Sequence, residues 1–287
     1  MSLCEVAVST WTGAVAAGDQ TEPLEAGNIL FCRDLRFDVN LDETHLFSPD
    51  ILGRAKNASF DPATGRLGGT TLTGSEAATL AAMMRRFSEA AAGLVDGVCP
   101  HYRGRVVRGR ASFRPAEIAG RASSWRKDDT RLHVDSFPAT PTGGRRILRV
   151  FSNVNPDGRA RTWRVGDAFE SVARRFARQL KLPLPGAGYA LALLRITKSP
   201  RTPYDALMLQ LHDAMKMDEE FQSSSPQSRV DFPSGSNWLC FTDQVSHAAM
   251  AGQYQLEQTF LLPVDAMKNP ERSPLRILER LKQRRLS

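Results

Sequence analysis

Apolar residues recur at helical spacing in three stretches of the chain. In 75–94 they stand three or four positions apart, which places them on one face of a helix. Ser75 or Thr73 stands where the N-cap of this helix is expected. Its Met and Phe stripe indicates a helix packed on a core rather than a binding groove. Similar patterns predict helices at 167–180 and 204–221.

Short apolar segments bounded by Gly and Pro surround the last two helices and predict strands. They lie at 28–33, 105–108, 131–135, 146–151, 237–242 and 253–263. Strands on both sides of a helical insertion favour one antiparallel sandwich or jelly roll over sequential βα units. We therefore expect an α+β fold, in which a jelly-roll core carries flanking and inserted helices.

A length of 287 residues fits one domain. We expect a flanking part at 1–98, the jelly-roll core at 99–265 with a helical insert at about 167–222, and a basic C-terminal helix at 266–287. The leucines of that last helix form one stripe beside several basic residues. Such a helix can rest on an anionic membrane surface, or it can pack on the domain or on a second subunit of a homo-oligomer.

Composition narrows the class of protein. No run of about 18 apolar residues is present, and the first residues lack the basic start of a signal peptide; we expect a cytoplasmic protein, with peripheral contact to the inner membrane possible. The four cysteines lack paired spacing, so neither disulfides nor a zinc site is indicated.

The net charge is +7, and only seven of the 38 basic residues are lysines. Arginine suits anionic ligands, although a coding bias explains the excess equally well. No motif indicates nucleic-acid binding.

One pair of residues has the spacing of metal ligands. His133 and Asp135 stand two apart in a predicted strand, so both side chains point to the same face. His247 follows a later strand-like run and is a candidate third ligand. Two histidines and one carboxylate form the facial triad of non-haem Fe(II) oxygenases. The other three histidines, His45, His101 and His212, are more simply interpreted as surface or packing residues, and a structural role for His133 is the competing interpretation.

Longer segments support the triad by resemblance. The segments 132–138 (LHVDSFP), 149–156 (RVFSNVNP) and 241–263 around His247, together with 204–216, resemble the Kdo hydroxylases of Gram-negative bacteria. The likeness covers nearly the whole chain, and these segments are more specific than the triad alone.

The resemblance implies a double-stranded β-helix fold with Fe(II) held by His133, Asp135 and His247. It also implies 2-oxoglutarate as cofactor and O2 as co-substrate. The expected reaction is 3-hydroxylation of the outer Kdo sugar of Kdo-bearing lipid A, a lipopolysaccharide precursor, to give Ko. The residues themselves support the metal site, whereas the sugar follows from the resemblance only.

The distal carboxylate of 2-oxoglutarate requires a cation. Many members of the wider superfamily place a basic residue about ten positions beyond the distal histidine, but this chain has Gln258 there. Other branches place one on the strand after H-x-D, which matches Arg149. We expect Arg149 to bind the cofactor with help from Gln258; a solvated strand arginine is the alternative.

An acidic sugar substrate predicts basic and aromatic residues near the iron. Arg126 and Lys127 precede the H-x-D strand, and Trp125 or Trp163 could stack on a sugar face. We expect Arg126 and Trp163 to bind substrate, although a loop with two bases and two acids is commonly just solvated.

Two other functions fit the same residues. The triad fixes the reaction type but not the substrate, so a hydroxylase of a protein side chain or small metabolite is one alternative. A jelly-roll carbohydrate-binding module without catalysis is the other. Loss of a triad position would favour the module, and all three positions are present.

Overall fold

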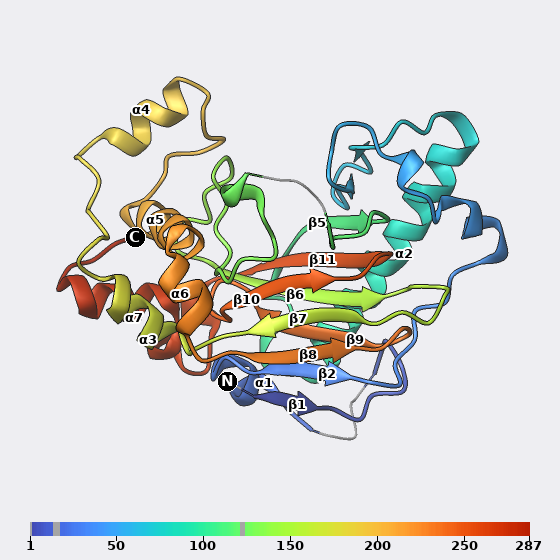
Figure 1. The fold of residues 1–287 in the computed structure, drawn as a ribbon, viewed down its shortest axis with the longest axis horizontal. Coiled ribbons are helices and arrows are strands. Elements are labelled where there is room, and N and C mark those ends of the chain that lie inside the picture. Colours follow the sequence, from blue (N-terminus) through green and yellow to red (C-terminus); the bar gives the residue numbers. More distant parts are fainter. Residues whose placement is uncertain (1, 14–17, 121–123) are drawn as a thin grey trace.

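Two β-sheets form the centre of the molecule in the computed structural model, which describes residues 2–13, 18–120 and 124–287 (Figure 1). The strands are β1 (Leu3–Glu5), β2 (Ile29–Cys32), β3 (Ala58–Phe60), β4 (Leu67–Gly68), β5 (Val107–Arg114), β6 (Arg146–Asn153), β7 (Arg161–Val165), β8 (Ser228–Phe232), β9 (Asn237–Phe241), β10 (His247–Ala251) and β11 (Gln255–Leu262).

The helices are α1 (Thr21–Glu25), α2 (Gly74–Val98), α3 (Phe169–Phe176), α4 (Ala187–Leu193), α5 (Pro203–Met217), α6 (Glu219–Ser224) and α7 (Pro274–Lys282), with short 3-10 turns η1 (Leu41–Leu46), η2 (Pro49–Ile51), η3 (Pro100–Tyr102), η4 (Trp125–Lys127), η5 (Val264–Ala266) and η6 (Pro270–Arg272). The fold is therefore mixed α+β, as the sequence predicts.

The larger sheet has the strand order β1-β2-β9-β6-β11-β5-β3-β4, and the smaller one has the order β10-β7-β8. All neighbours pair antiparallel except β1 and β2. Residues 1–98, which we expected only to flank the core, supply strands to both edges of the larger sheet. The helical insert lies between β7 and β8.

Aromatic side chains fill the space between the two sheets. Phe151 and Trp238 of the larger sheet meet Trp163 and Phe232 of the smaller one, and the rings of Phe232 and Trp238 stack with centroids 3.9 Å apart. Residues at alternate strand positions therefore face this inter-sheet space.

Helix α2 covers the other face of the larger sheet. Its apolar stripe, which includes Leu80 and Phe87, is buried against Leu148, Val150 and Leu256. The predicted helix at 75–94 is thus confirmed, and its stripe is core, as expected. A residue on β6 or β11 consequently faces either the α2 core or the inter-sheet space, according to its position along the strand.

The remaining large helices, α3, α5, α6 and α7, gather at one end of the strands (Figure 1). In α7, Leu275 and Leu278 are buried in the protein core. The apolar stripe of the basic C-terminal helix is therefore covered by the domain itself. Within the described residues, no helix combines the length and apolar character needed to cross a bilayer.

Candidate metal centre

Backbone hydrogen bonds bring His133 next to His247. Although 131–135 does not form the strand that the sequence predicts, His133 makes an isolated antiparallel bridge to His247 at the start of β10. Each backbone N–H donates to the carbonyl of the other residue, at 3.0 and 2.9 Å, and the Asp135 N–H donates to the Thr242 carbonyl at 2.8 Å. The prediction that His133 and Asp135 share a face is confirmed, and residues distant in sequence become paired neighbours.

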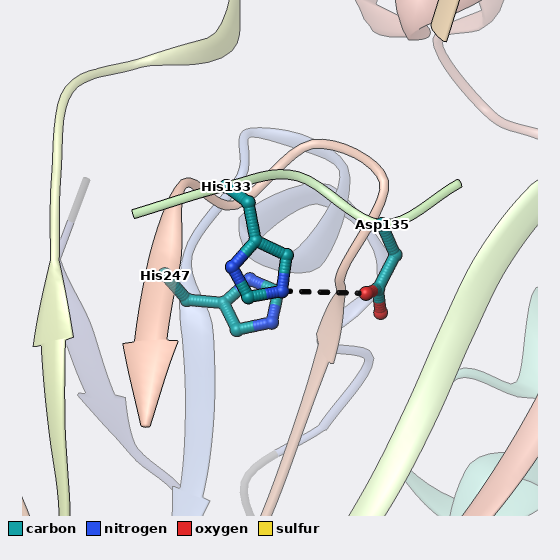
Figure 2. Close-up of side chains that lie close together, drawn as sticks. All are labelled: His133, Asp135 and His247. Carbon is teal, nitrogen blue, oxygen red and sulfur yellow. Dashed lines mark ion pairs between the residues drawn. The ribbon is translucent and has the colours of Figure 1, made fainter. Parts of the chain in front are cut away.

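Both imidazoles are oriented by the backbone. The Nδ1–H of His133 donates to the Arg131 carbonyl at 2.7 Å, and that of His247 donates to the Val245 carbonyl at 2.8 Å. This arrangement leaves the lone pairs of both Nε2 atoms free to bind a metal. One ligand atom from each of His133, Asp135 and His247 lies within 4.8 Å of the others (Figure 2).

The protonation states suit a cation. Burial, followed by the neighbouring His247, holds the pKa of His133 well below its usual value, so the ring is neutral. Burial alone would raise the pKa of Asp135, but Arg149 and the smaller effects of His247 and His133 together outweigh it and lower the pKa. Its Oδ2 is buried and accepts no hydrogen bond within the described structure. Burial likewise lowers the pKa of His247. Two neutral imidazoles and one carboxylate whose Oδ2 accepts no hydrogen bond therefore fit a divalent metal with open coordination positions.

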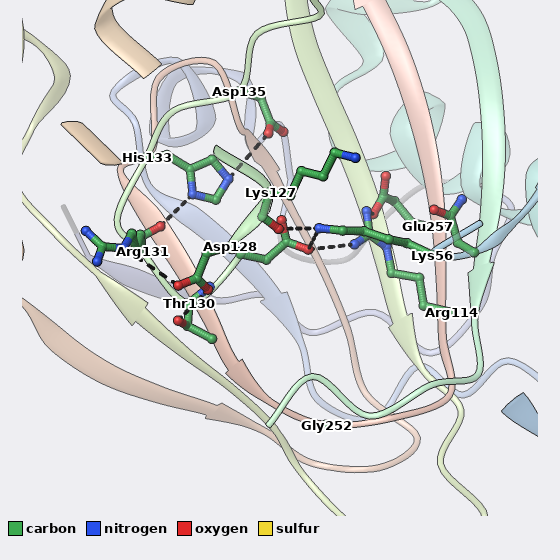
Figure 3. Close-up of polar contacts among 12 residues, drawn as sticks. Lys56, Arg114, Lys127, Asp128, Thr130, Arg131, His133, Asp135, Gly252 and Glu257 are labelled. Atoms are coloured by element: carbon green, nitrogen blue, oxygen red, sulfur yellow. Dashed lines mark hydrogen bonds and ion pairs between the residues drawn. The ribbon is translucent and has the colours of Figure 1, made fainter. Parts of the chain in front are cut away.

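A chain of alternating charges lies beside Asp135. Arg149 Nε is 3.3 Å from Asp135 Oδ2, and its Nη1 donates to Glu257 at 2.7 Å. Arg114 pairs with Glu257 at 3.2 Å and with Asp129 at 3.6 Å. Figure 3 shows how Arg114 and Glu257 lie relative to Asp135. Sequence reasoning missed Glu257 and Arg114, because alternation along β11 and β5 shows which residues share a face but only the strand pairing shows which face lies toward the site.

Arg161 on β7 carries a buried charge without a carboxylate partner. It is 2% exposed, and its Nη1 donates to the Gly252 carbonyl at 2.8 Å. Burial and then the repulsion of Arg114 lower its pKa to about 9. No ion pair joins it to any described carboxylate. Sequence reasoning missed this residue because nothing in its local sequence distinguishes it from the other arginines.

Five buried N–H donors in the inter-sheet space make no hydrogen bond to a described residue. They are the Nε–H groups of Arg114, Arg149 and Arg161 and the indole N–H groups of Trp163 and Trp238. Buried donors in native proteins are normally paired. Unpaired donors on three cations, together with the Trp163 indole beside them, indicate a place built for an anionic ligand with several acceptor oxygens.

The two predicted cofactor-binding residues do not meet. Arg149 faces the inter-sheet space, as its contact with Asp135 requires. Gln258 pairs across the ladder with Val150, which belongs to the α2 core, so its side chain is on the opposite face of the sheet. Its amide donates to the Gly109 carbonyl at 2.9 Å. The expectation that Gln258 assists Arg149 is therefore wrong.

The two predicted substrate residues have different surroundings. Trp163 is 2% exposed and stacks on His247, with ring centroids 5.0 Å apart. This ring is part of the aromatic core and is closed to a sugar arriving from solvent, so that expectation is wrong. Arg126 is exposed and pairs with Asp213 at 3.2 Å. The sequence assigned His212 to the surface or to packing, but its ring lies 5.4 Å from that of His133, next to Asp213.

A cavity of about 480 Å3 reaches Arg149, which forms the ion pair with the candidate ligand Asp135. Glu257 also lines it, and the loop after Asp135 contributes Phe137. Its remaining lining residues are Asn57, Gly109, Arg110, Ser112, Arg114, Thr140, Pro141, Arg145, Lys198, Ser199, Thr259 and Leu261. Basic side chains far outnumber the single glutamate. A larger cavity near Phe37 and Asn155 lacks Arg149, and none of the three candidate metal ligands lines either cavity.

A 2-His-1-carboxylate donor set at the edge of a two-sheet β core is the arrangement of a non-haem iron oxygenase. The family model for 3-deoxy-D-manno-oct-2-ulosonic acid (Kdo) hydroxylase matches residues 11–285. The chain therefore belongs to the Kdo hydroxylase family. No match was found among curated proteins.

Solved structures agree with this assignment. The chain is 43% identical to the Kdo hydroxylase KdoO, a non-haem Fe(II) α-ketoglutarate-dependent dioxygenase crystallised with α-ketoglutarate and Fe(III). The alignment covers 100% of this chain and 97% of that one, with a TM-score of 0.96. A cobalt(II) complex of KdoO matches at 44% identity over 99% and 97% of the two chains, also with a TM-score of 0.96.

Proposed function

We propose that this protein is an Fe(II)- and 2-oxoglutarate-dependent dioxygenase that hydroxylates the outer Kdo sugar of Kdo-bearing lipid A at C3. The observation that carries the proposal is the convergence of His133, Asp135 and His247 beside a basic cavity. Membership of the Kdo hydroxylase family supports the choice of sugar.

The two-sheet core supports a double-stranded β-helix. The central strands β9-β6-β11-β5 oppose β10-β7-β8, and the His133 bridge adds a further short pairing beside β10. In this arrangement the metal ligands lie at one edge of the inter-sheet space. The rigid sheets would thus hold the ligands and the cofactor in a fixed relation.

His133, Asp135 and His247 would bind the iron on one face and leave its other positions open. When bound there with 2-oxoglutarate and O2, the iron supplies the oxidation of a substrate C–H bond to C–OH, while 2-oxoglutarate becomes succinate and CO2. Arg149 positions the Asp135 carboxylate through the 3.3 Å ion pair. The stacked Trp163 ring holds His247 in place and excludes water from behind it.

The unpaired donors support an anchor for 2-oxoglutarate made by Arg161, Arg114 and Trp163 together with Arg149. Arg149 alone is a poor anchor because Asp135 and Glu257 already neutralise it. Arg161 has no carboxylate partner to neutralise it, and it lies two residues from Trp163 on the same face of β7. A dicarboxylate would supply the acceptors that these buried groups lack.

We expect Arg161→Met to weaken 2-oxoglutarate binding by about 10- to 100-fold, the value of a lost charge-assisted hydrogen bond. Without the cofactor the variant should be as stable as the wild type or more stable, because it removes a buried charge that has no carboxylate partner. Thermal unfolding of the cobalt-loaded protein, with and without 2-oxoglutarate, measures both effects.

The matched control is Arg229→Met on the neighbouring strand β8, where Arg229 is exposed and pairs with Asp231. This control should keep the full stabilisation by 2-oxoglutarate. Equal stabilisation of the Arg161→Met protein would exclude Arg161 from the anchor.

The basic lining of the cavity suits an acidic sugar. Arg110, Arg145 and Lys198 line it, and no described carboxylate forms an ion pair with any of the three. A Kdo carboxylate could bind this group while the sugar ring approaches the metal ligands. We propose these residues in place of Trp163 as the substrate contacts; Arg126 would contribute only from the exposed rim.

The decisive assay is incubation with Kdo-bearing lipid A, Fe(II), 2-oxoglutarate and O2, followed by mass spectrometry. We expect one added oxygen on the outer sugar and one succinate per product. Lipid A lacking Kdo is the matched substrate control and should stay unchanged. Turnover of 2-oxoglutarate without a change in the mass of the sugar would refute the proposed substrate but not the oxygenase chemistry.

A further inference from the structure

The chain between α3 and α5 forms an apolar projection, here called the α4 arm (residues 181–201). Figure 1 shows α4 standing clear of the sheets and of the other helices. No residue of α4 is buried. Six of the ten exposed large apolar side chains among the described residues belong to this arm: Leu182, Leu184, Tyr189, Leu193, Leu194 and Ile196. Exposed apolar groups gathered in one place commonly mark an interaction site.

The charge of the arm has one sign. No aspartate or glutamate occurs between Glu170 and Asp205, whereas the arm itself contains Lys181, Arg195, Lys198 and Arg201. Leu193 and Leu194 are 85% and 69% exposed and directly precede Arg195. Apolar side chains flanked only by bases are complementary to a bilayer that carries anionic headgroups.

The base of the arm contacts the candidate active site. The Lys198 N–H donates to the Ala139 carbonyl at 2.9 Å, and Arg201 donates to the Pro138 carbonyl at 2.6 Å. These carbonyls belong to the loop that follows the candidate ligand Asp135. Lys198 and Ser199 also line the basic cavity. The α4 arm therefore joins its exposed apolar side chains directly to the wall of the cavity.

We propose that the α4 arm docks the protein on the surface of an anionic lipid bilayer, with its leucines and Tyr189 inserted among the headgroups. This inference deepens the proposed function and rests on it in one respect, since a lipid-anchored sugar must reach the cavity at the membrane surface. A second copy of the chain fits the arm less well, because a symmetric contact through the arms would bring like charges together.

Vesicle binding tests the arm directly. The probes are vesicles of phosphatidylcholine alone and vesicles with about one third phosphatidylglycerol, sedimented with the full-length protein. We expect binding to the anionic vesicles, weakened by salt. The double variant Leu193→Ser with Leu194→Ser should bind about tenfold less tightly or weaker still. Leu41→Ser is the matched control, because Leu41 is 91% exposed and lies outside the arm.

Activity on two substrates separates this inference from the proposed function. The double variant should hydroxylate a water-soluble Kdo saccharide at the wild-type rate but lose activity on Kdo-bearing lipid in vesicles. If the wild type hydroxylates neither substrate, the proposed function fails, while vesicle binding still decides the role of the arm.

Two results would overturn the docking role. One is equal binding of wild type and double variant to the anionic vesicles. The other is a wild-type dimer that the double variant converts to monomer without any vesicle binding, since the arm would then be an interface between copies. Because the replaced leucines are exposed, the unfolding temperature should be unchanged, which verifies that the variant is folded.

Discussion

His133→Ala is expected to abolish hydroxylation and to weaken metal binding by at least about 100-fold. Loss of a group that merely orients a ligand costs about 10- to 100-fold, and His133 would supply a ligand atom itself. The variant also loses the 2.7 Å bond to the Arg131 carbonyl, which orients the ring. Anaerobic calorimetric titration with Co(II) measures the affinity, and succinate formation measures the activity.

His101→Ala is the matched control, because His101 is exposed and outside the site. It should bind Co(II) and form succinate as the wild type does. A His133→Ala protein that binds Co(II) with unchanged affinity would refute the assignment of His133, even if its activity were low.

Asp243→Ala is expected to destabilise the fold by about 3–5 kcal/mol, because it leaves the buried Arg146 guanidinium without its carboxylate. Asp243 accepts from Arg146 at 2.8 and 3.2 Å, and the two side chains are 1% and 0% exposed. Burial raises the pKa of Asp243 although Arg146 opposes the rise. The complete pair therefore adds little to the free energy of unfolding, but removing either partner leaves the other as an unpaired buried charge.

Replacing both partners separates these two effects. Arg146→Met with Asp243→Leu should recover most of the lost stability, because apolar residues of similar size replace a buried pair at little cost. Urea unfolding monitored by circular dichroism gives the free energies. If the double variant is as unstable as Asp243→Ala, general packing damage rather than an unpaired charge is responsible.

The segment 242–246, between β9 and β10, connects the Arg146–Asp243 pair to the metal ligands. The Thr242 carbonyl accepts the backbone N–H of Asp135, and His247 follows four residues after Asp243. The Arg146–Asp243 pair therefore fixes the segment that positions two of the three ligands.

The metal ligands were the part of the site most accessible to sequence reasoning. A spacing of two predicts a common face for His133 and Asp135, whether the segment forms a long strand or a single bridge. The structure has only the bridge, yet the geometry is as expected. The position of His247 required the resemblance in addition, because no local rule relates residues that pair across such a distance.

The cofactor side of the site was much harder to predict. Gln258 and Glu257 are adjacent in sequence but face opposite sides of the sheet, and only the pairing of β11 with β6 shows which one faces inward. Arg161 is one arginine among 31, and its lack of a carboxylate partner is a property of the packed fold. Trp163 shows the same difficulty, since an indole suits a sugar platform and an aromatic core equally well.

Long elements were easier to predict than short ones. The apolar stripe of α2 runs through several turns, and its predicted range of 75–94 falls within the observed Gly74–Val98. Helix α4 has only seven residues and follows a Pro- and Gly-containing stretch. Because its apolar side chains face solvent, there is no amphipathic period from which to recognise it.

The reciprocal backbone bonds between His133 and His247 have a further consequence for metal exchange. The bridge and the two carbonyl-bound Nδ1 atoms hold both rings through the protein's own hydrogen bonds. Such a preorganised centre has little reorganisation to undergo when an ion enters or leaves. Metal uptake should therefore be nearly independent of folding, in contrast to zinc fingers, which are unfolded without their metal. Removal of the metal by a chelator would therefore abolish activity but leave the protein folded and able to bind metal again.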